Sequence, residues 1–198
     1  MQTLGRPREF DPEETLFKIM QLFWENGYEA TGLRDIIQAT NLGKASLYKA
    51  LGNKQSMYLK ALSHYEGLMV EAAVTTLRST DQPPIDRIEM FLSSPIIAVR
   101  DHKDRRGCFL CNAAADRASL DEEAGKLVQR GYAKMRRAVH ASLIEAEPTL
   151  DPLLAAARAE LVLTVYSGLR VMARSGIAPE VLSLAKEQAI RGVSDRGK

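Results

Sequence analysis

The chain has 198 residues, of which 45% are hydrophobic and 26% are charged, and its formal net charge is +2. This composition is typical of a globular protein with a substantial buried core. No apolar run approaches the roughly eighteen residues of a membrane span. The N-terminal segment MQTLGRPREF lacks the apolar core of a signal peptide, and the only two cysteines lie too close together to staple a fold. We therefore expect a reduced, cytoplasmic protein.

Helix signals recur along the chain, whereas strand signals are nearly absent. Asp11 and Pro12 supply an N-cap and a first helical position, and Gly27 ends the helix that they open. Thr31 is then expected to cap a second short helix. A tight turn at residues 41–43 leads into a third helix, from about Lys44 to Leu51. At 100° per residue its inner face is formed by Leu47, Ala50 and Leu51.

The remaining helices are mostly longer. One is expected from Lys54 to about Arg78, with one side formed by Tyr58, Leu62, Tyr65, Met69 and Ala72. The segment STDQPPID is typical of a linker. Further helices are expected to begin at Pro84, near Cys108, after Asp121, at Pro152 and at Pro179. The pattern predicts an all-α fold of about nine helices, with a compact three-helix head and a larger helical body.

Basic residues gather in one part of the chain. Residues 31–60 contain the single acid Asp35 and five basic residues, namely Arg34, Lys44, Lys49, Lys54 and Lys60. The net charge hides this local excess, because the preceding segment is rich in glutamate. A cluster of charge is usually a solvated surface, but it is also what a nucleic-acid interface requires.

Two short helices joined by a tight turn and supported by another helix predict a helix-turn-helix. The second of them, at residues 44–51, is too short to be stable alone and is expected to be stabilised by its neighbours. Its outward positions are Lys44, Ala45, Ser46, Tyr48 and Lys49. Such a face suits a DNA groove, because a small residue permits close approach and lysines reach bases or phosphates. A merely solvated helix is the alternative interpretation.

The series LFWENGYEATGLRDIIQATNLGKASLYKALGNKQSMYLKAL closely resembles the N-terminal DNA-binding domain of the TetR family of transcriptional regulators. The matching features are the F…GY.AT segment, the L.DI…A.L.K.SLY block and the L..K start of the next helix, over roughly residues 10–60. Two positions depart from the family pattern. Gly43 stands where the family often has a capping serine, and Ala50-Leu51 replaces a commoner aromatic pair.

The resemblance implies a DNA-binding head at residues 1–60 and an effector-binding, dimerising body at residues 61–198. It implies a homodimer that binds a palindromic operator in double-stranded DNA, as a repressor that a small-molecule inducer releases. The implied phosphate contacts are Thr31, Ser46, Tyr48 and Lys54. Nearest the bases would be Lys44, Ala45 and Lys49. Arg6 and Arg8 either form an arm that enters a minor groove or remain solvated.

The body is expected to hold the effector beside the long helix. By helix position, the pocket would be lined by Phe91, Cys108, Phe109, Asn112 and Tyr166, although each aromatic residue can equally belong to a plain core. One wide apolar stripe is formed by Leu154, Ala157, Leu161, Val165 and Leu169. This stripe indicates either a central core helix or, as the resemblance implies, part of a four-helix dimer interface.

A thiol-based redox or electrophile sensor is an alternative mechanism for the same regulator. Arg105, Arg106 and the start of a helix would all favour a thiolate at Cys108, with Cys111 as a resolving thiol. The stretch GCFLCNAAAD also looks like a segment of TetR-family regulators that sense electrophiles. The opposing interpretation is that cysteine behaves as a small, buried and inert hydrophobe.

An enzyme is the alternative from another class, and we do not expect one. No βαβ pattern surrounds CFLC, so a thioredoxin-like dithiol is disfavoured. One Cys-x-x-Cys pair is a weak metal signal, and the histidines His64, His102 and His140 are scattered. We therefore expect no metal and no cofactor. A helical scaffold protein without DNA activity is a third possibility.

Overall fold

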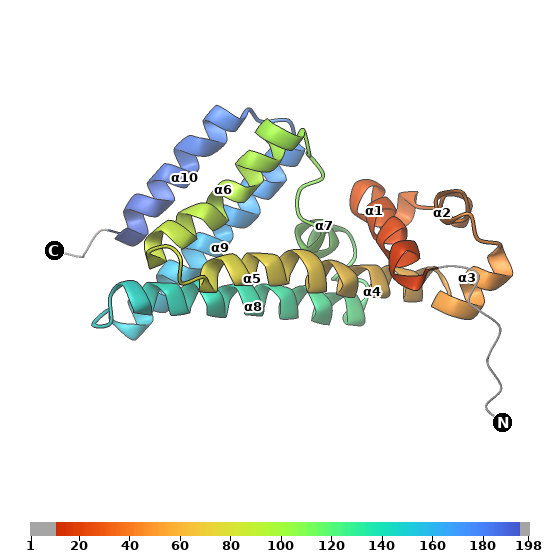
Figure 1. Cartoon of the computed structure of the whole chain (residues 1–198), viewed down its shortest axis with the longest axis horizontal. Helices are drawn as coiled ribbons and strands as arrows, with labels where there is room; N and C mark the ends of the chain where they lie inside the picture. Colours follow the sequence, from red (N-terminus) through yellow and green to blue (C-terminus); the bar gives the residue numbers. More distant parts are fainter. Residues whose placement is uncertain (1–10, 195–198) are drawn as a thin grey trace, which may run out of the picture. The chain divides into compact units, whose positions relative to one another are not determined.

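The computed structural model describes residues 11–194, which divide into two compact units (Figure 1). Unit 1 reaches to His64 and unit 2 begins at Tyr65, whereas the sequence placed the boundary at residue 60. The described residues form α-helices and one π-helical turn, and contain no strand. Helix α4, the π-helical turn and α5 follow one another without a break. Counted as one rod, they bring the described helices to nine and confirm the predicted all-α fold.

Unit 1 begins with α1 (Pro12–Ala30), which Asp11 caps by accepting a hydrogen bond from the backbone N–H of Glu13 at 2.8 Å. Gly27 interrupts the helix as predicted, because its φ of 81° lies in the left-handed region that favours glycine. Thr31 was expected to cap α2 (Leu33–Thr40), and that prediction is wrong. Gly32 is the N-cap, and the Thr31 hydroxyl instead donates to the Gly27 carbonyl at 2.7 Å.

The third helix, α3 (Lys44–Leu51), has the predicted bounds. Its two leucines, Leu47 and Leu51, lie one turn apart and are buried. Ala50 was expected on the same inner face, but it is exposed, because two leucines suffice to cover the narrow contact of so short a helix. The C-terminal carbonyls of α3 are held from outside the helix, since the Lys60 ammonium group donates to the carbonyl of Leu51 at 3.1 Å.

An aromatic cluster fills part of unit 1. The ring of Tyr58 on α4 (Lys54–Tyr65) lies edge-on to Phe23 at 5.1 Å and to Tyr28 at 5.0 Å. Edge-to-face pairs at these separations are favourable beyond the apolar area that they bury. The cluster therefore fixes α4 against the end of α1.

The rod continues from α4 through the π-helical turn η1 (Glu66–Val70) into α5 (Glu71–Arg78). Its ends match the predicted helix, but its buried face does not. Met69 is 41% exposed and Ala72 is exposed, although both were expected to follow Tyr65 on the inner side. The buried residues are Val70, Val74 and Leu77, because the π-helical turn contains one more residue than an α-turn.

The C-terminal end of α5 is tied to two neighbouring helices. The Leu77 carbonyl accepts a hydrogen bond from Arg87 on α6 (Pro84–His102) at 3.2 Å. It also accepts one from the Ser142 hydroxyl on α8 (Glu122–Ala146) at 2.8 Å. Arg87 is only 2% exposed and also pairs with Glu145 at 2.6 Å. The Leu77 carbonyl, near the end of the rod, is thus satisfied by two side chains.

Unit 2 is a bundle in which α5 lies along α8 and α6 packs against both (Figure 1). Two further helices, α9 (Pro152–Arg174) and α10 (Pro179–Ser194), pack on α6 and on each other. The short α7 (Phe109–Asp116) contacts α8 and α9. Most of these helices begin where capping residues and prolines predicted: Asp121 and Asp151 cap α8 and α9, and Pro84 and Pro179 open α6 and α10.

Helix α9 has one buried and one exposed apolar side. Val162, Tyr166 and Leu169 are buried in unit 2. Within residues 11–194, α9 is also the one helix whose length and mean hydropathy of 1.2 would suffice for a membrane span. Its contacts with α6, α8 and α10 account for part of that apolarity, since 39% of the apolar stretch is buried and a core helix passes the same test.

Candidate functional site

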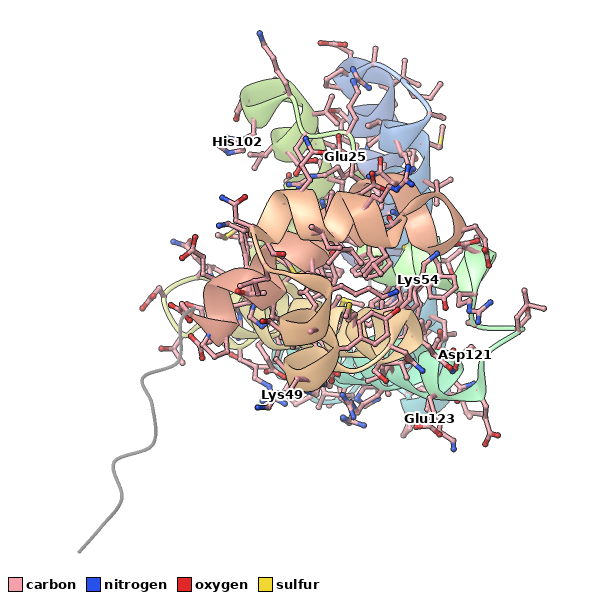
Figure 2. All side chains as sticks on the ribbon, turned by 90° about the vertical axis from the view of Figure 1, so that its right-hand side faces the viewer. Glu25, Lys49, Lys54, His102, Asp121 and Glu123 are labelled. Carbon is pink, nitrogen blue, oxygen red and sulfur yellow. The ribbon has the colours of Figure 1, made fainter. Side chains whose placement is uncertain are left out.

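The outer surface of α3 forms the first candidate site. All five residues predicted to face outward, Lys44, Ala45, Ser46, Tyr48 and Lys49, are exposed. They are held there by the two buried leucines, which lie on the opposite side of the helix. In Figure 2, Lys49 lies on α3 and Lys54 at the start of α4. We call these six residues the α3 surface.

Lys54 differs from the lysines of α3 because it is partly buried. Its ammonium group lies 4.4 Å from the centre of the Tyr28 ring, a cation–π contact that fixes the position of the charge. The side chain of Asn53 caps α4 and accepts a hydrogen bond from the backbone N–H of Ser56 at 2.8 Å. The first turn of α4 is therefore ordered, with a lysine held beside its positive end.

Thr31 does not join the α3 surface. Its side chain is fully buried, and its hydroxyl donates to backbone carbonyls at the end of α1. The phosphate contact predicted for Thr31 stays a prediction, and it would require the side chain to leave these bonds. Threonine is a common N-cap, but here the carbonyls freed by the break at Gly27 provide the nearer acceptor.

A group of polar side chains inside unit 2 forms the second candidate site. The Tyr65 hydroxyl lies 3.5 Å from the Cys108 sulfur, and the Cys111 sulfur lies 3.1 Å from the Tyr132 hydroxyl. The Ser167 hydroxyl lies 3.5 Å from the same Tyr132 oxygen. These residues come from the rod, α7, α8 and α9. We call them, together with Tyr166 and Arg170, the thiol–tyrosine cluster.

Arg170 supplies the positive charge of the cluster. Its guanidinium donates to the Tyr166 hydroxyl at 3.1 Å and to the Ser94 hydroxyl at 3.1 Å. Its charge also reaches one carboxylate, since Arg170 contributes to lowering the pKa of Asp104. A guanidinium whose direct partners are neutral hydroxyls favours any anion that forms beside it.

Apolar rings surround this polar group. Phe91 stacks on Tyr166 with ring centres 4.2 Å apart, and Phe109 lies edge-on to Tyr65 at 5.7 Å. Gly107 brings the chain close to α9, since a Cβ at that position would lie 3.1 Å from the Arg170 carbonyl. Glycine with a φ of 77° permits this approach and places the next residue, Cys108, against α9.

The two thiols of the cluster have opposite acidities. The Cys111 thiol, together with Arg170 and the Tyr65 hydroxyl, lowers the pKa of Cys108 to about 6 even though burial opposes ionisation. The hydrogen bond to Cys108 and burial raise the pKa of Cys111. Burial also raises the pKa of Tyr65 and Tyr132. The cluster therefore favours a single thiolate, on Cys108.

The residues proposed for an effector site are brought together in part. Phe91, Cys108, Phe109 and Tyr166 all lie in or against the thiol–tyrosine cluster. Asn112 instead holds the loop before α7, where its amide donates to the Arg106 carbonyl at 3.0 Å. The sequence did not indicate a role in this site for Tyr65, Tyr132 or Arg170. An arginine flanked by apolar residues of α9 was the one available signal for Arg170.

The cation beside Cys108 is not the one that the sequence suggested. Arg105 donates to the Ala173 carbonyl at 3.1 Å, and Arg106 pairs with Asp104 at 2.7 Å. Both arginines are thus engaged elsewhere, and Arg170 acts on the thiol in their place. Within residues 11–194, no three His, Cys, Asp or Glu residues are grouped closely enough to hold a metal ion.

Comparisons with known proteins agree with both parts of the chain. Residues 18–61 match the family model "Bacterial regulatory proteins, tetR family", and residues 84–188 match the model "Transcriptional regulator LmrA/YxaF-like, C-terminal domain". The second match alone spans more than half of the chain. Neither model describes an enzyme.

Similar full-length proteins are regulators as well. The chain is 28% identical over 145 residues to the uncharacterized HTH-type transcriptional regulator YezE of Bacillus subtilis, covering 73% of this chain and 74% of that protein. It is 24% identical to the HTH-type transcriptional repressor ComR of Escherichia coli, covering 90% and 86%. Among solved structures, a cysteine mutant of the TetR family regulator CifR, complexed with 26-bp operator DNA, is 25% identical, with a TM-score of 0.81 over 94% of this chain and 98% of that chain. With a helix-turn-helix in unit 1 and a matching helical unit 2, the chain belongs to the TetR family of bacterial transcriptional regulators.

Proposed function

We propose that the protein is a dimeric, cytoplasmic repressor that binds a palindromic operator through the α3 surface and releases it when a small molecule binds unit 2. The observation that carries the proposal is α3 itself. A helix of eight residues is anchored by two buried leucines, while its outer face presents lysines and small residues. This is the arrangement of a recognition helix that enters a major groove.

Relatives support the repressor role. ComR is described as a transcriptional repressor, and so is BdcR of Escherichia coli, which is 26% identical over 178 residues. The CifR structure contains operator DNA bound to a chain of this fold. The same mode of binding transferred to this chain assigns phosphate contacts to Ser46, Tyr48 and Lys54, and base contacts to Lys44, Ala45 and Lys49.

The exposed side of α9 and α10 supports a dimer. Apolar side chains of these two helices that are at least 40% exposed are Leu153, Leu154, Leu161, Val171, Met172, Val181 and Leu184. Many exposed apolar side chains on two adjacent helices commonly mark an interface. Leu169, which the sequence placed on the same stripe, belongs to the core of unit 2 instead. Two copies would each bring one α3 surface to one half of a palindrome.

The test separates contacts to bases from contacts to phosphates. Replacing Lys54 by alanine should weaken binding to all sequences alike and reduce the salt dependence of binding by about one ion equivalent. Replacing Lys49 should reduce discrimination between operator variants by about 1–3 kcal/mol. Fluorescence anisotropy at several salt concentrations, with an operator selected from random DNA, measures both effects and the stoichiometry of two chains per site.

Lys18→Ala is the matched control. Lys18 is a lysine of unit 1 that pairs with Glu14 on α1 at 2.7 Å, away from the α3 surface, so its replacement should leave affinity unchanged. A Lys49 variant that lost affinity equally for every sequence would contradict the base-reading role. One chain per palindrome would contradict the dimer.

A specific observation favours a second candidate mechanism, in which the effector modifies Cys108. Its sulfur accepts from Tyr65, lies within the electrostatic influence of Arg170 and is stabilised as a thiolate by Cys111. A small electrophile that reached this thiolate would form a covalent bond inside the cluster. The thiol is only 2% exposed, which restricts the mechanism to compact reagents.

The pH dependence of the thiolate tests this candidate. The measured quantity is the thiolate absorbance of the wild type minus that of Cys108→Ser. This difference should rise with a midpoint near pH 6, because the folded-state pKa of Cys108 is lowered to about 6. An ordinary cysteine would give a midpoint at pH ~8.5. Cys111→Ala should move the midpoint upward, because it removes the thiol whose hydrogen bond lowers the pKa of Cys108. N-ethylmaleimide should release operator from the wild type and not from Cys108→Ser. Equal release from both would leave reversible binding as the mechanism.

A further inference from the structure

The π-helical turn in the rod aligns the buried face of α4 with the buried face of α5. At 100° per residue, an uninterrupted α-helix would place Val70, Val74 and Leu77 roughly 120–180° around the helix from Tyr65. All four side chains are nevertheless buried in unit 2. The extra residue of η1 removes about 100° of that difference and brings the two faces into line.

Two anchors hold the rod at the start of this turn. Tyr65, the last residue of α4, donates to the Cys108 sulfur on the segment that opens α7. Glu66, the first residue of η1, is 3% exposed and accepts from the Arg130 Nε on α8, which lies 2.9 Å from both of its carboxylate oxygens. Lys134 on the same helix lies 3.0 Å from Glu66. Both partners lie in unit 2.

The bonds of the turn itself are weaker than those of an α-helix. A π-helical turn closes hydrogen bonds to the fifth residue and is rare, so it persists only where contacts outside the helix compensate. The exposed residues of the turn, Gly67, Leu68 and Met69, make no contribution to the buried face. Tyr65 and Glu66 therefore contribute much of what keeps the extra residue in place.

We propose that η1 is a register switch, in which loss of the contact between Tyr65 and Cys108 lets the π-helical turn relax to α-helix. The inference rests on the proposed function, because its consequence is a change in operator binding. Relaxation by one residue would turn the rod N-terminal to η1 by about 100° and shift it by about 1.5 Å relative to α5. Tyr65 is then a positioning residue. Its contact with the thiol–tyrosine cluster determines the orientation of α4, the helix that follows the α3 surface.

The switch predicts a specific non-additivity. Deleting Gly67 removes the extra residue and restores α-helical spacing between Tyr65 and the buried face of α5, so that no second register is left. Tyr65→Phe should change operator affinity by about fivefold or more in the wild-type background, the factor implied by one hydrogen bond. In the Gly67-deletion background the same substitution should have no effect. Thr76→Val, which removes a rod hydroxyl that bonds only within α5 to the Ala72 carbonyl at 3.2 Å, should leave affinity unchanged in both backgrounds.

A second measurement does not depend on DNA. Hydrogen exchange of the amides in residues 66–74 should slow about fivefold in Tyr65→Phe, because α-helical hydrogen bonds replace the weaker ones of the π-helical turn, and should not change when the same substitution is made in the deletion variant. Deleting Leu68, which is equally exposed, gives the same spacing if the first deletion does not fold. A Tyr65→Phe effect of equal size in both backgrounds, or none in either, overturns the switch. If the wild type bound no operator but Tyr65→Phe changed the exchange rates as predicted in the two backgrounds, the proposed function would be overturned and the switch would not.

Discussion

Leu47→Ala is expected to destabilise unit 1 strongly and to weaken operator binding while the stability of unit 2 is unchanged. Leu47 is fully buried and is one of two leucines that hold α3. Leu→Ala in a core costs about 2–5 kcal/mol. A unit of 64 residues has a stability of roughly 3–10 kcal/mol at usual values per residue, so this single change removes a large part of it. Urea unfolding, monitored by the hydrogen exchange of amides in each unit, measures the free energy of unfolding of unit 1 and of unit 2 separately.

The neighbouring residue provides the control. Tyr48→Ala removes a large side chain that is 43% exposed, so the free energy of unfolding should change by no more than about 0.5 kcal/mol. Operator affinity should still fall, because Tyr48 belongs to the α3 surface. If both variants lose binding and only Leu47→Ala loses stability, Leu47 acts by anchoring α3 and Tyr48 acts by contacting DNA. Equal stability of the two variants would refute the anchoring role of Leu47.

Phe91→Ala is expected to destabilise unit 2 by about 3–5 kcal/mol. Phe91 is 2% exposed and stacks on Tyr166, so its removal leaves a cavity beside the thiol–tyrosine cluster and frees the ring that carries the Arg170 guanidinium. Differential scanning calorimetry should show a lowered transition for unit 2. The thiolate titration should also change, because Arg170 loses a fixed partner.

Met90 is the matched control for this substitution. It precedes Phe91 on α6 and is 50% exposed, so Met90→Ala should change stability by at most about 0.5 kcal/mol. A loss of several kcal/mol in Met90→Ala would show that the α6 surface is covered in solution. A Phe91→Ala variant as stable as the wild type would contradict the packing of unit 2.

The start of most helices was predictable because the signals are local. Asp11 and Asp121 accept hydrogen bonds from the first turns that they cap, and Pro84 and Pro179 each open a helix. These residues act through the few positions that follow them, which the sequence displays directly. The outward face of α3 followed in the same way from helical periodicity.

The errors arose where distant or irregular structure decided the outcome. Met69 and Ala72 were placed inside because the periodicity assumed an α-helix, and the single extra residue of η1 moved the buried face to Val70 and Val74. Arg170 reaches Cys108 only through the packing of α9 beside α7. No spacing within the sequence shows that contact, whereas Arg105 and Arg106 were near in the chain and engaged elsewhere.

The two hydrogen bonds that the Leu77 carbonyl accepts have a mechanical consequence. Because Arg87 and Ser142 hold the last turn of α5 to two helices, that end of the rod acts as a fixed support. A rotation of the rod therefore moves its N-terminal end more than its C-terminal end. Substituting Arg87 or Ser142 would free the C-terminal end, and part of the same rotation would then be taken up by movement of α5 within unit 2.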